Sequence, residues 1–270
     1  MSVLALAPMP FLSACSSDPG RAVFEKAEKS LSDGDADSAL KQYGYVIANN
    51  PESAYAAKSQ YKIALIYNRY IGDRKKAMEA YSALFFLYPG TAETTEARED
   101  LASIYSVMGE HRLAIEQYQL LLNEKPSDYD KFQYAIAMEY IMQNDFRQAR
   151  VEFTELLKRA NADLQPQINY QIANTYYIEG NLAEAADGYE KTAARFPDNP
   201  AALDARLGTA KVLSESGKLA LALALLKELK GKYPNKGAIG IMMDSLQTRL
   251  DEGPGSKKRA VVSEKEPLRD

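Results

Sequence analysis

The chain has 270 residues and a formal net charge of −4, with 46% hydrophobic and 26% charged residues, which is typical of a folded globular protein. The negative charge leaves no basic excess to attract nucleic acid. A single cysteine excludes an internal disulfide, and a single histidine excludes a His-rich metal site and argues against a conventional catalytic triad.

The chain opens with a short apolar segment. Residues 2–14 read SVLALAPMPFLSA, which is shorter than the roughly 20 residues of a membrane-spanning helix and suits the hydrophobic region of a secretory signal. The segment ends in Leu12-Ser13-Ala14-Cys15, where a branched apolar residue and two small residues precede the only cysteine. This motif resembles the lipobox of bacterial lipoproteins.

The resemblance implies that residues 1–14 are a signal peptide and that the Cys15 thiol is acylated at the mature N-terminus. Ser16 rather than Asp follows the cysteine, which by the family's sorting rule implies the outer membrane, on its periplasmic side. Residues 15–21 would then be a lipidated polar tether. No Lys or Arg precedes Arg21, unlike in most signals, and the alternative interpretation is an apolar N-terminus with an incidental cysteine.

Six segments of the remaining chain repeat one pattern: Gly, then Ala five residues later, an aromatic residue four after that, and Pro eight further on. The alanines lie 35 to 38 residues apart, at Ala39, Ala77, Ala114, Ala149, Ala185 and Ala222. The fourth segment has Asn144 in place of Gly and Asn161 in place of Pro, and the sixth has Leu226 in place of the aromatic residue.

Each position of this pattern has a physical reason. Gly or Asn adopts the left-handed backbone of a tight turn between two helices. Ala lets the two helices approach closely, the aromatic ring fills the adjacent space, and Pro ends the second helix. Another small residue occurs seven positions before the turn in five of the segments, whereas the second segment has Leu65 there.

The pattern resembles the tetratricopeptide repeat, a helix–turn–helix unit of about 34 residues. The resemblance covers residues 22–235 and implies an all-α fold, a right-handed superhelix (solenoid) of about six helix pairs. The junctions between repeats are similar to those of the outer-membrane barrel-assembly lipoprotein and of the Tol–Pal-associated repeat protein. No feature singles out either family, so the sequence indicates a generic repeat lipoprotein.

The chain ends in a predicted helix and a polar tail. Residues 237–252 keep helical apolar spacing without a partner helix, which predicts a helix that caps the solenoid of residues 22–252. Residues 253–270 combine Gly, Pro and mixed charge, and we expect them to be disordered. The missing Gly and Pro of the fourth repeat also leave open a hinge at residues 158–168.

In the tetratricopeptide family the first helix of each pair lines a concave groove, and counting from the small residues gives its inward positions. The predicted partner-binding set is Lys62, Ile66, Arg69, Tyr70, Tyr134, Met138, Tyr170, Asn174 and Tyr177. The same count also gives Glu96, Glu99, Ser103, Ser106, Ile141, Met142, Ile178, Leu207, Lys211 and Ser214. Tyr and Met offer adaptable binding area, which favours an extended or helical peptide of another envelope protein. The alternative is that some of these side chains pack between neighbouring helices.

The sequence contains none of the common catalytic motifs, among them G-x-S-x-G, H-E-x-x-H and the Gly-rich phosphate loops. We therefore expect a non-enzymatic protein–protein interaction scaffold without metal or cofactor, lipid-anchored to the outer membrane and facing the periplasm. Its expected role is to support an envelope assembly such as outer-membrane protein insertion. The alternative is a module that binds glycan, peptidoglycan or a small ligand in cell-wall processes.

Overall fold

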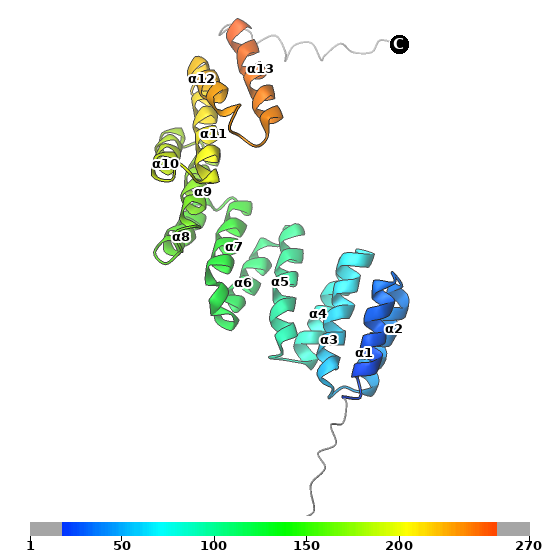
Figure 1. Cartoon of the computed structure of the whole chain (residues 1–270). Helices are drawn as coiled ribbons and strands as arrows, with labels where there is room; N and C mark the ends of the chain where they lie inside the picture. Colours follow the sequence, from blue (N-terminus) through cyan, green and yellow to red (C-terminus); the bar gives the residue numbers. More distant parts are fainter. Residues whose placement is uncertain (1–17, 253–270) are drawn as a thin grey trace, which may run out of the picture. The chain divides into compact units, whose positions relative to one another are not determined.

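The computed structural model describes residues 18–252, and the regular elements in this range are all helices (Figure 1). The predictions for the signal peptide, for Cys15 and for the tail fall on residues 1–17 and 253–270, outside the described residues. The α-helices are α1 (Arg21–Ser32), α2 (Ala36–Asn49), α3 (Ala54–Leu65), α4 (Arg74–Leu87), α5 (Ala92–Val107), α6 (His111–Glu124), α7 (Tyr129–Met142), α8 (Phe146–Leu157), α9 (Gln165–Ile178), α10 (Leu182–Arg195), α11 (Pro200–Glu215), α12 (Leu219–Leu229) and α13 (Lys236–Glu252). A π-helix, η1 (Ile66–Ile71), continues α3, and a 3-10 turn, η2 (Pro126–Asp128), precedes α7.

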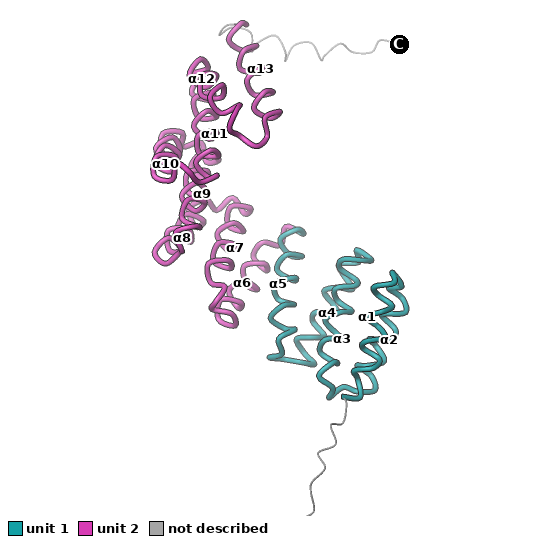
Figure 2. Tube along the Cα trace, viewed as in Figure 1, with its two compact units in different colours: residues 1–108 teal, residues 109–270 magenta. Residues whose placement is uncertain are grey.

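The chain divides into two compact units, one up to Met108 and one from Gly109 (Figure 2). Unit 1 contains α1 to α5, and unit 2 contains α6 to α13. Within each unit, consecutive helices pack against one another as antiparallel neighbours. The predicted all-α helical-repeat fold is therefore confirmed. Residues 158–168, where the sequence allows a hinge as an alternative interpretation, lie inside unit 2. The boundary between the two units is therefore not at this segment.

The turns within the helix pairs have the predicted backbone. Five turn glycines have φ between 75° and 84°, namely Gly34, Gly72, Gly109, Gly180 and Gly217. Asn144, with φ 61°, is the one non-glycine residue of the described range with positive φ. After glycine, Asn is among the residues that adopt this left-handed backbone most readily, because its short polar side chain can form local hydrogen bonds. Three of the following helices begin with an Asp whose carboxylate accepts a hydrogen bond from a backbone N–H three residues on: Asp35, Asp73 and Asp145.

The small residues lie where two helices cross, as the sequence predicts. Ala39, Ala77, Ala149 and Ala185 are fully buried. The approach is close between α9 and α10, where a side chain added to Gly188 would place its Cβ 2.8 Å from Ala173 Cβ. Only glycine fits at such a separation, so small residues at the crossings set how closely these helices pack.

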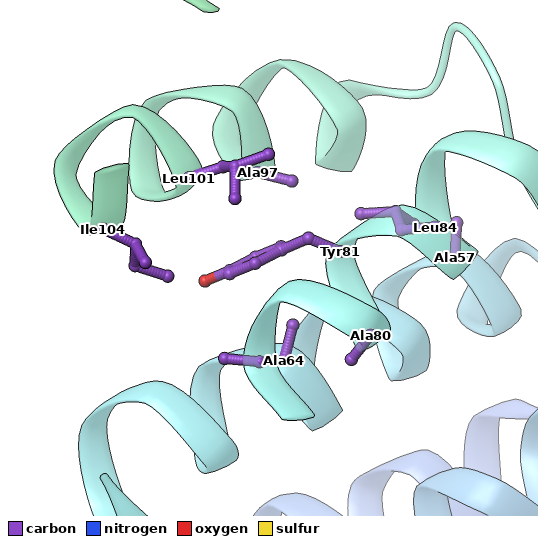
Figure 3. Close-up of a cluster of buried hydrophobic side chains, with 9 residues drawn as sticks. Ala57, Ala64, Ala80, Tyr81, Leu84, Ala97, Leu101 and Ile104 are labelled. Atoms are coloured by element: carbon purple, nitrogen blue, oxygen red, sulfur yellow. The ribbon is translucent and has the colours of Figure 1, made fainter. Parts of the chain in front are cut away.

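The core of unit 1 is built around the ring of Tyr81 (Figure 3). Tyr81 on α4 lies between α3 and α5, and it contacts small residues of α3 and the larger Leu101 and Ile104 of α5. The ring is fully buried, and its hydroxyl has no hydrogen-bond partner among the described residues. Burial, together with the charge of nearby Asp100, strongly raises the Tyr81 pKa.

The second repeat differs from the others in register. The fully buried small residue of its first helix is Ala64 and not Leu65, so eight residues rather than seven separate it from the turn at Gly72. The π-helix η1 accommodates the additional residue, because its i→i+5 hydrogen bonds enclose one residue more per turn than an α-helix. The alignment of Leu65 with the small residues of the other repeats is therefore wrong by one position.

The C-terminal helix covers the last repeat, close to the predicted bounds. α13 buries Ile239 and Leu246 against the core of α11 and α12. The Arg249 guanidinium donates a hydrogen bond to Ser214 Oγ of α11 at 2.9 Å. The apolar side of the last repeat thus has a partner, as a solenoid end requires.

Candidate protein-binding surface

In four repeats, an aromatic side chain of the first helix packs against an aromatic side chain of the second helix. In each pair, the residue three positions before the buried alanine of the first helix packs its ring against the aromatic residue of the second helix. The ring centroids are 5.4 to 6.3 Å apart in Phe24–Tyr43, Tyr61–Tyr81, Tyr134–Phe153 and Tyr170–Tyr189. Such pairs stabilise a core beyond their buried area.

Tyr134 and Tyr170 are therefore part of the repeat core as well as of its surface. Both side chains are half-buried, and burial is the main cause that raises the pKa of each hydroxyl. One side of each ring packs on Phe153 or Tyr189. The alternative interpretation, in which these tyrosines pack between helices, therefore applies to one side of each ring.

Ile66 does not lie on a surface. It is fully buried in the core around Ala27 and Tyr43, so the prediction that it contributes to partner binding is wrong. The cause is the shift of one residue in the second repeat: the equivalent of Tyr134 is Tyr61, and Lys62 occupies the next position.

Lys62 and Arg69 contact the neighbouring first helices of unit 1 instead of standing free. Lys62 Nζ lies 2.9 Å from Glu28 Oε1 of α1, and Arg69 Nη2 lies 2.8 Å from Asp100 Oδ1 of α5. These ion pairs link successive first helices. Tyr70, by contrast, is exposed at the end of η1.

The remaining predicted residues of unit 2 lie on α7 and α9. Met138 is partly buried against the core between α7, α8 and α9. Asn174 Oδ1 accepts a hydrogen bond from the Tyr189 hydroxyl at 3.2 Å. The Tyr177 hydroxyl donates to Glu215 of α11, and burial together with this bond raises the pKa of Tyr177 to about 12. These contacts fix the side chains of α9 relative to its neighbours.

In each unit, exposed apolar side chains lie at the C-terminal ends of first helices. The position two residues before the turn Gly or Asn is occupied by Tyr70 and Val107 in unit 1 and by Met142 and Ile178 in unit 2. These four side chains, two in each unit, share one position of the repeat and are between 49% and 67% exposed; we call the pair in either unit the first-helix row of that unit. The first and sixth repeats have polar residues at the same position.

Sequence reasoning found three of these four residues. Counting from the small residues includes Tyr70, Met142 and Ile178, but it misses Val107. Counting two residues back from the turn Gly or Asn gives all four.

The described residues contain neither a cluster of metal-ligating side chains nor a membrane-spanning helix. Within residues 18–252, no group of three or more His, Cys, Asp or Glu side chains is placed to hold a metal ion. His111 Nδ1 instead lies 2.7 Å from Glu139 Oε2, where it pairs with a buried carboxyl group. None of the helices in the same range is both long and apolar enough to cross a bilayer.

Comparisons with known proteins agree with this geometry. Family models described as tetratricopeptide repeat match residues 58–91, 134–200 and 170–236, together about half of the chain. A search of curated proteins by sequence finds no match.

Solved structures of tetratricopeptide-repeat proteins have the same fold at low sequence identity. A tetratricopeptide repeat protein from Parabacteroides merdae superposes with a TM-score of 0.61 at 18% identity, covering 86% of this chain and 87% of its own. The C-terminal part of a repeat-containing protein from Cytophaga hutchinsonii gives 0.59 at 15% identity, over 88% and 98%. PilW, described as a type IV pilus biogenesis factor, gives 0.54 at 15% identity, over 84% and 100%.

The matched segments include α3–α4 of unit 1 and the helix pairs of unit 2 from α7 to α12, and no enzymatic family is indicated. The turn residues and the buried alanines are the same features that the sequence pattern predicts. The chain belongs to the tetratricopeptide repeat family.

Proposed function

We propose that the chain is a non-enzymatic protein–protein interaction scaffold in which each unit binds partners through its own first-helix row. The observation that carries this proposal is the recurrence of a large, exposed apolar side chain at one position of four consecutive repeats. Single exposed apolar residues need no explanation, but a regular set of them indicates an interaction surface.

The surroundings of the row favour a peptide as partner. In unit 2, Met142 and Ile178 stand at the ends of α7 and α9, whose other surface residues are mainly uncharged and already hydrogen-bonded or packed. An extended or helical segment that presents apolar side chains at intervals would contact this surface without burying unpaired charge.

The proposed setting is the periplasmic side of the outer membrane, with the chain anchored by lipid on Cys15. The Leu12-Ser13-Ala14-Cys15 motif and the Ser at position 16 support it. The role would be to support an envelope assembly, first outer-membrane protein insertion, then Tol–Pal or cell-wall coordination, then export or pilus machinery. PilW, a pilus biogenesis factor of similar fold, belongs to the last of these classes.

The alternative, glycan or small-ligand binding, gains no support from the tyrosines. Sugar stacking requires an open ring face, and packing on Phe153 and Tyr189 takes up one side of Tyr134 and Tyr170. Sedimentation with peptidoglycan is the direct test of this alternative.

The test of the scaffold compares two pairs of substitutions in unit 2. The Met142→Ser/Ile178→Ser variant changes the row, and the Val151→Ser/Leu221→Ser variant changes comparably exposed residues on the second helices α8 and α12. We expect affinity capture from a bacterial envelope extract to retain a defined protein set with the wild type and the second variant, and to lose it with the first. Equal capture by both variants would contradict the assignment of the row.

The anchor has its own test. Full-length chain expressed with its upstream region is compared with a Cys15→Ala variant by intact mass and membrane fractionation. We expect the wild type to lose residues 1–14, to gain acyl mass and to float with outer membrane, and the variant to do none of these. An unmodified wild type would overturn the anchor and the localisation together.

A further inference from the structure

The chain is attached firmly to unit 1 before its first helix begins. The Asp18 carboxylate accepts hydrogen bonds from the Ser53 hydroxyl and from the backbone N–H groups of Gly20 and Ala54, at 2.9 and 3.0 Å for the two amides. Ser53 and Ala54 are the cap and the first residue of α3, so Asp18 caps a helix 36 residues away in sequence. Gly20 packs so closely on Ser53 and Val46 that no larger residue fits.

This attachment shortens the predicted tether. The tether was expected to include residues 15–21, but Asp18 to Arg21 belong to the folded unit. Three residue steps separate Cys15 from Asp18, and a fully extended chain spans at most about 11 Å over that length. Any group attached to Cys15 is therefore held next to the end of unit 1 where α3 begins.

The same end of unit 1 exposes two large apolar side chains. Phe86, 83% exposed, is the most exposed large apolar residue of the described range, and Leu87 beside it is also exposed. Both lie in the last turn of α4, which runs antiparallel to α3 and so ends where α3 begins (Figure 1). Tyr88 follows α4 and Glu52 precedes α3. Burial raises the Tyr88 pKa and the Glu52 charge raises it further, so the end of α4 lies near the start of α3.

The charged groups of this end do not favour an ionic partner. Arg21 is paired with Glu25 at 2.7 Å, and Lys58 lies over the Tyr55 ring at 5.1 Å. Glu52 adds a negative charge, so the surface has no basic excess. An exposed Phe–Leu pair with nearly balanced charge suits the interfacial layer of a bilayer, where apolar side chains insert to a depth of about 5–10 Å.

We propose that this N-terminal edge of unit 1, formed by residues 18–20, 50–53 and 86–90, rests on the lipid surface to which Cys15 is anchored. Phe86 and Leu87 insert into the interfacial layer, and the anchor and the edge together hold unit 1 upright on the membrane. The inference rests on the proposed acylation of Cys15, since one Phe–Leu pair alone gives weak and reversible binding.

The experiment uses the single cysteine of the chain and its lack of tryptophan. The chain has one Cys, so the full chain can be coupled through Cys15 to maleimide-bearing lipid in vesicles of phosphatidylethanolamine and phosphatidylglycerol. It has no Trp, so Phe86→Trp places a single tryptophan at the edge, which can be excited selectively over the tyrosines at long wavelength. Tyr70→Trp is the matched control, because Tyr70 is also exposed and lies in the same unit at the far end of α3–η1, about 25 Å along the helix axis.

We expect brominated acyl chains to quench tethered Phe86→Trp at least about threefold more than tethered Tyr70→Trp, with a blue-shifted emission only in the former. The result should change little with salt, because apolar insertion and not charge drives it. A Cys15→Ser/Phe86→Trp chain, which cannot be coupled, should show little quenching. Circular dichroism of each variant establishes that unit 1 is folded.

Equal quenching at the two positions, or none at either, would overturn the proposal. A blue shift of Phe86→Trp that grows with protein concentration in the absence of vesicles would also overturn it, by showing that a second copy covers the edge. Chemical coupling replaces natural acylation in this assay. If the protein carried no acyl group in cells, the proposed anchor would be refuted. The quenching would still show whether Phe86 inserts into lipid when Cys15 is tethered to it.

Discussion

The substitution Gly208→Ala tests the close packing of helices in unit 2. Gly208 is buried on α11 and faces the ring of Tyr189 on α10. A Cβ at this position would lie 2.5 to 2.7 Å from three ring atoms, whereas ordinary contacts begin near 3.4 Å. The ring cannot move aside easily, because it is 1% exposed and packs on Tyr170.

The expected loss of stability follows from two opposing effects. Forcing one methyl group into a packed core costs about 2–3 kcal/mol. Replacing glycine by alanine within a helix returns about 1 kcal/mol. The free energy of unfolding should therefore fall by about 1–2 kcal/mol, which for a unit of this size lowers the Tm by roughly 3–6 °C.

Gly240→Ala is the matched control in the same unit. Gly240 lies within α13, and an added Cβ there would meet no atom within 4 Å. Only the helix-propensity gain applies, so unfolding should require about 0.5–1 kcal/mol more. Both variants are followed by circular dichroism during thermal and urea unfolding. If Gly208→Ala were as stable as Gly240→Ala, the packing of α10 against α11 described above would be wrong.

Three further predictions concern buried polar groups. The pKa of Tyr177 is raised to about 12, so its hydroxyl contributes stability below the ordinary tyrosine pKa near 10, and this contribution is lost as pH rises through about 12. Tyr177→Phe should therefore reduce the loss of unfolding free energy at alkaline pH, measured by urea unfolding at a series of pH values. His111→Leu leaves the buried Glu139 carboxyl group without its hydrogen-bond partner and should lower the unfolding free energy by about 2 kcal/mol, most of which His111→Leu/Glu139→Leu should regain. Tyr81→Phe removes a buried hydroxyl without a partner, so its unfolding free energy should stay within about 0.5 kcal/mol of the wild type or rise.

The local features of the fold could be predicted from the sequence because each depends on residues close together in the chain. A turn glycine, a buried alanine and a closing proline act within one helix pair, and the exception at Asn144 follows the same left-handed backbone. The capping helix could be predicted because its apolar spacing remains without a partner.

The features that were missed depend on contacts between repeats. The π-helix shifts the second repeat by one residue, which places Ile66 in the core and Tyr61 beside Tyr81. Its one local sign is Leu65 at the position where the other repeats have a small residue, with Ala64 just before it. The capping of α3 by Asp18 joins residues 36 apart. The division after Met108 likewise has no signal in composition or turn residues.

The central claim, that the first-helix row binds partner proteins, is tested most directly by photo-crosslinking in living cells. A photoreactive amino acid is placed at Met142 or at Ile178, and in control strains at Val151 or at Leu221. The account predicts discrete adducts with one or a few envelope proteins from the first two positions and none from the other two. No adducts from Met142 and Ile178, or the same adducts from all four positions, would contradict it.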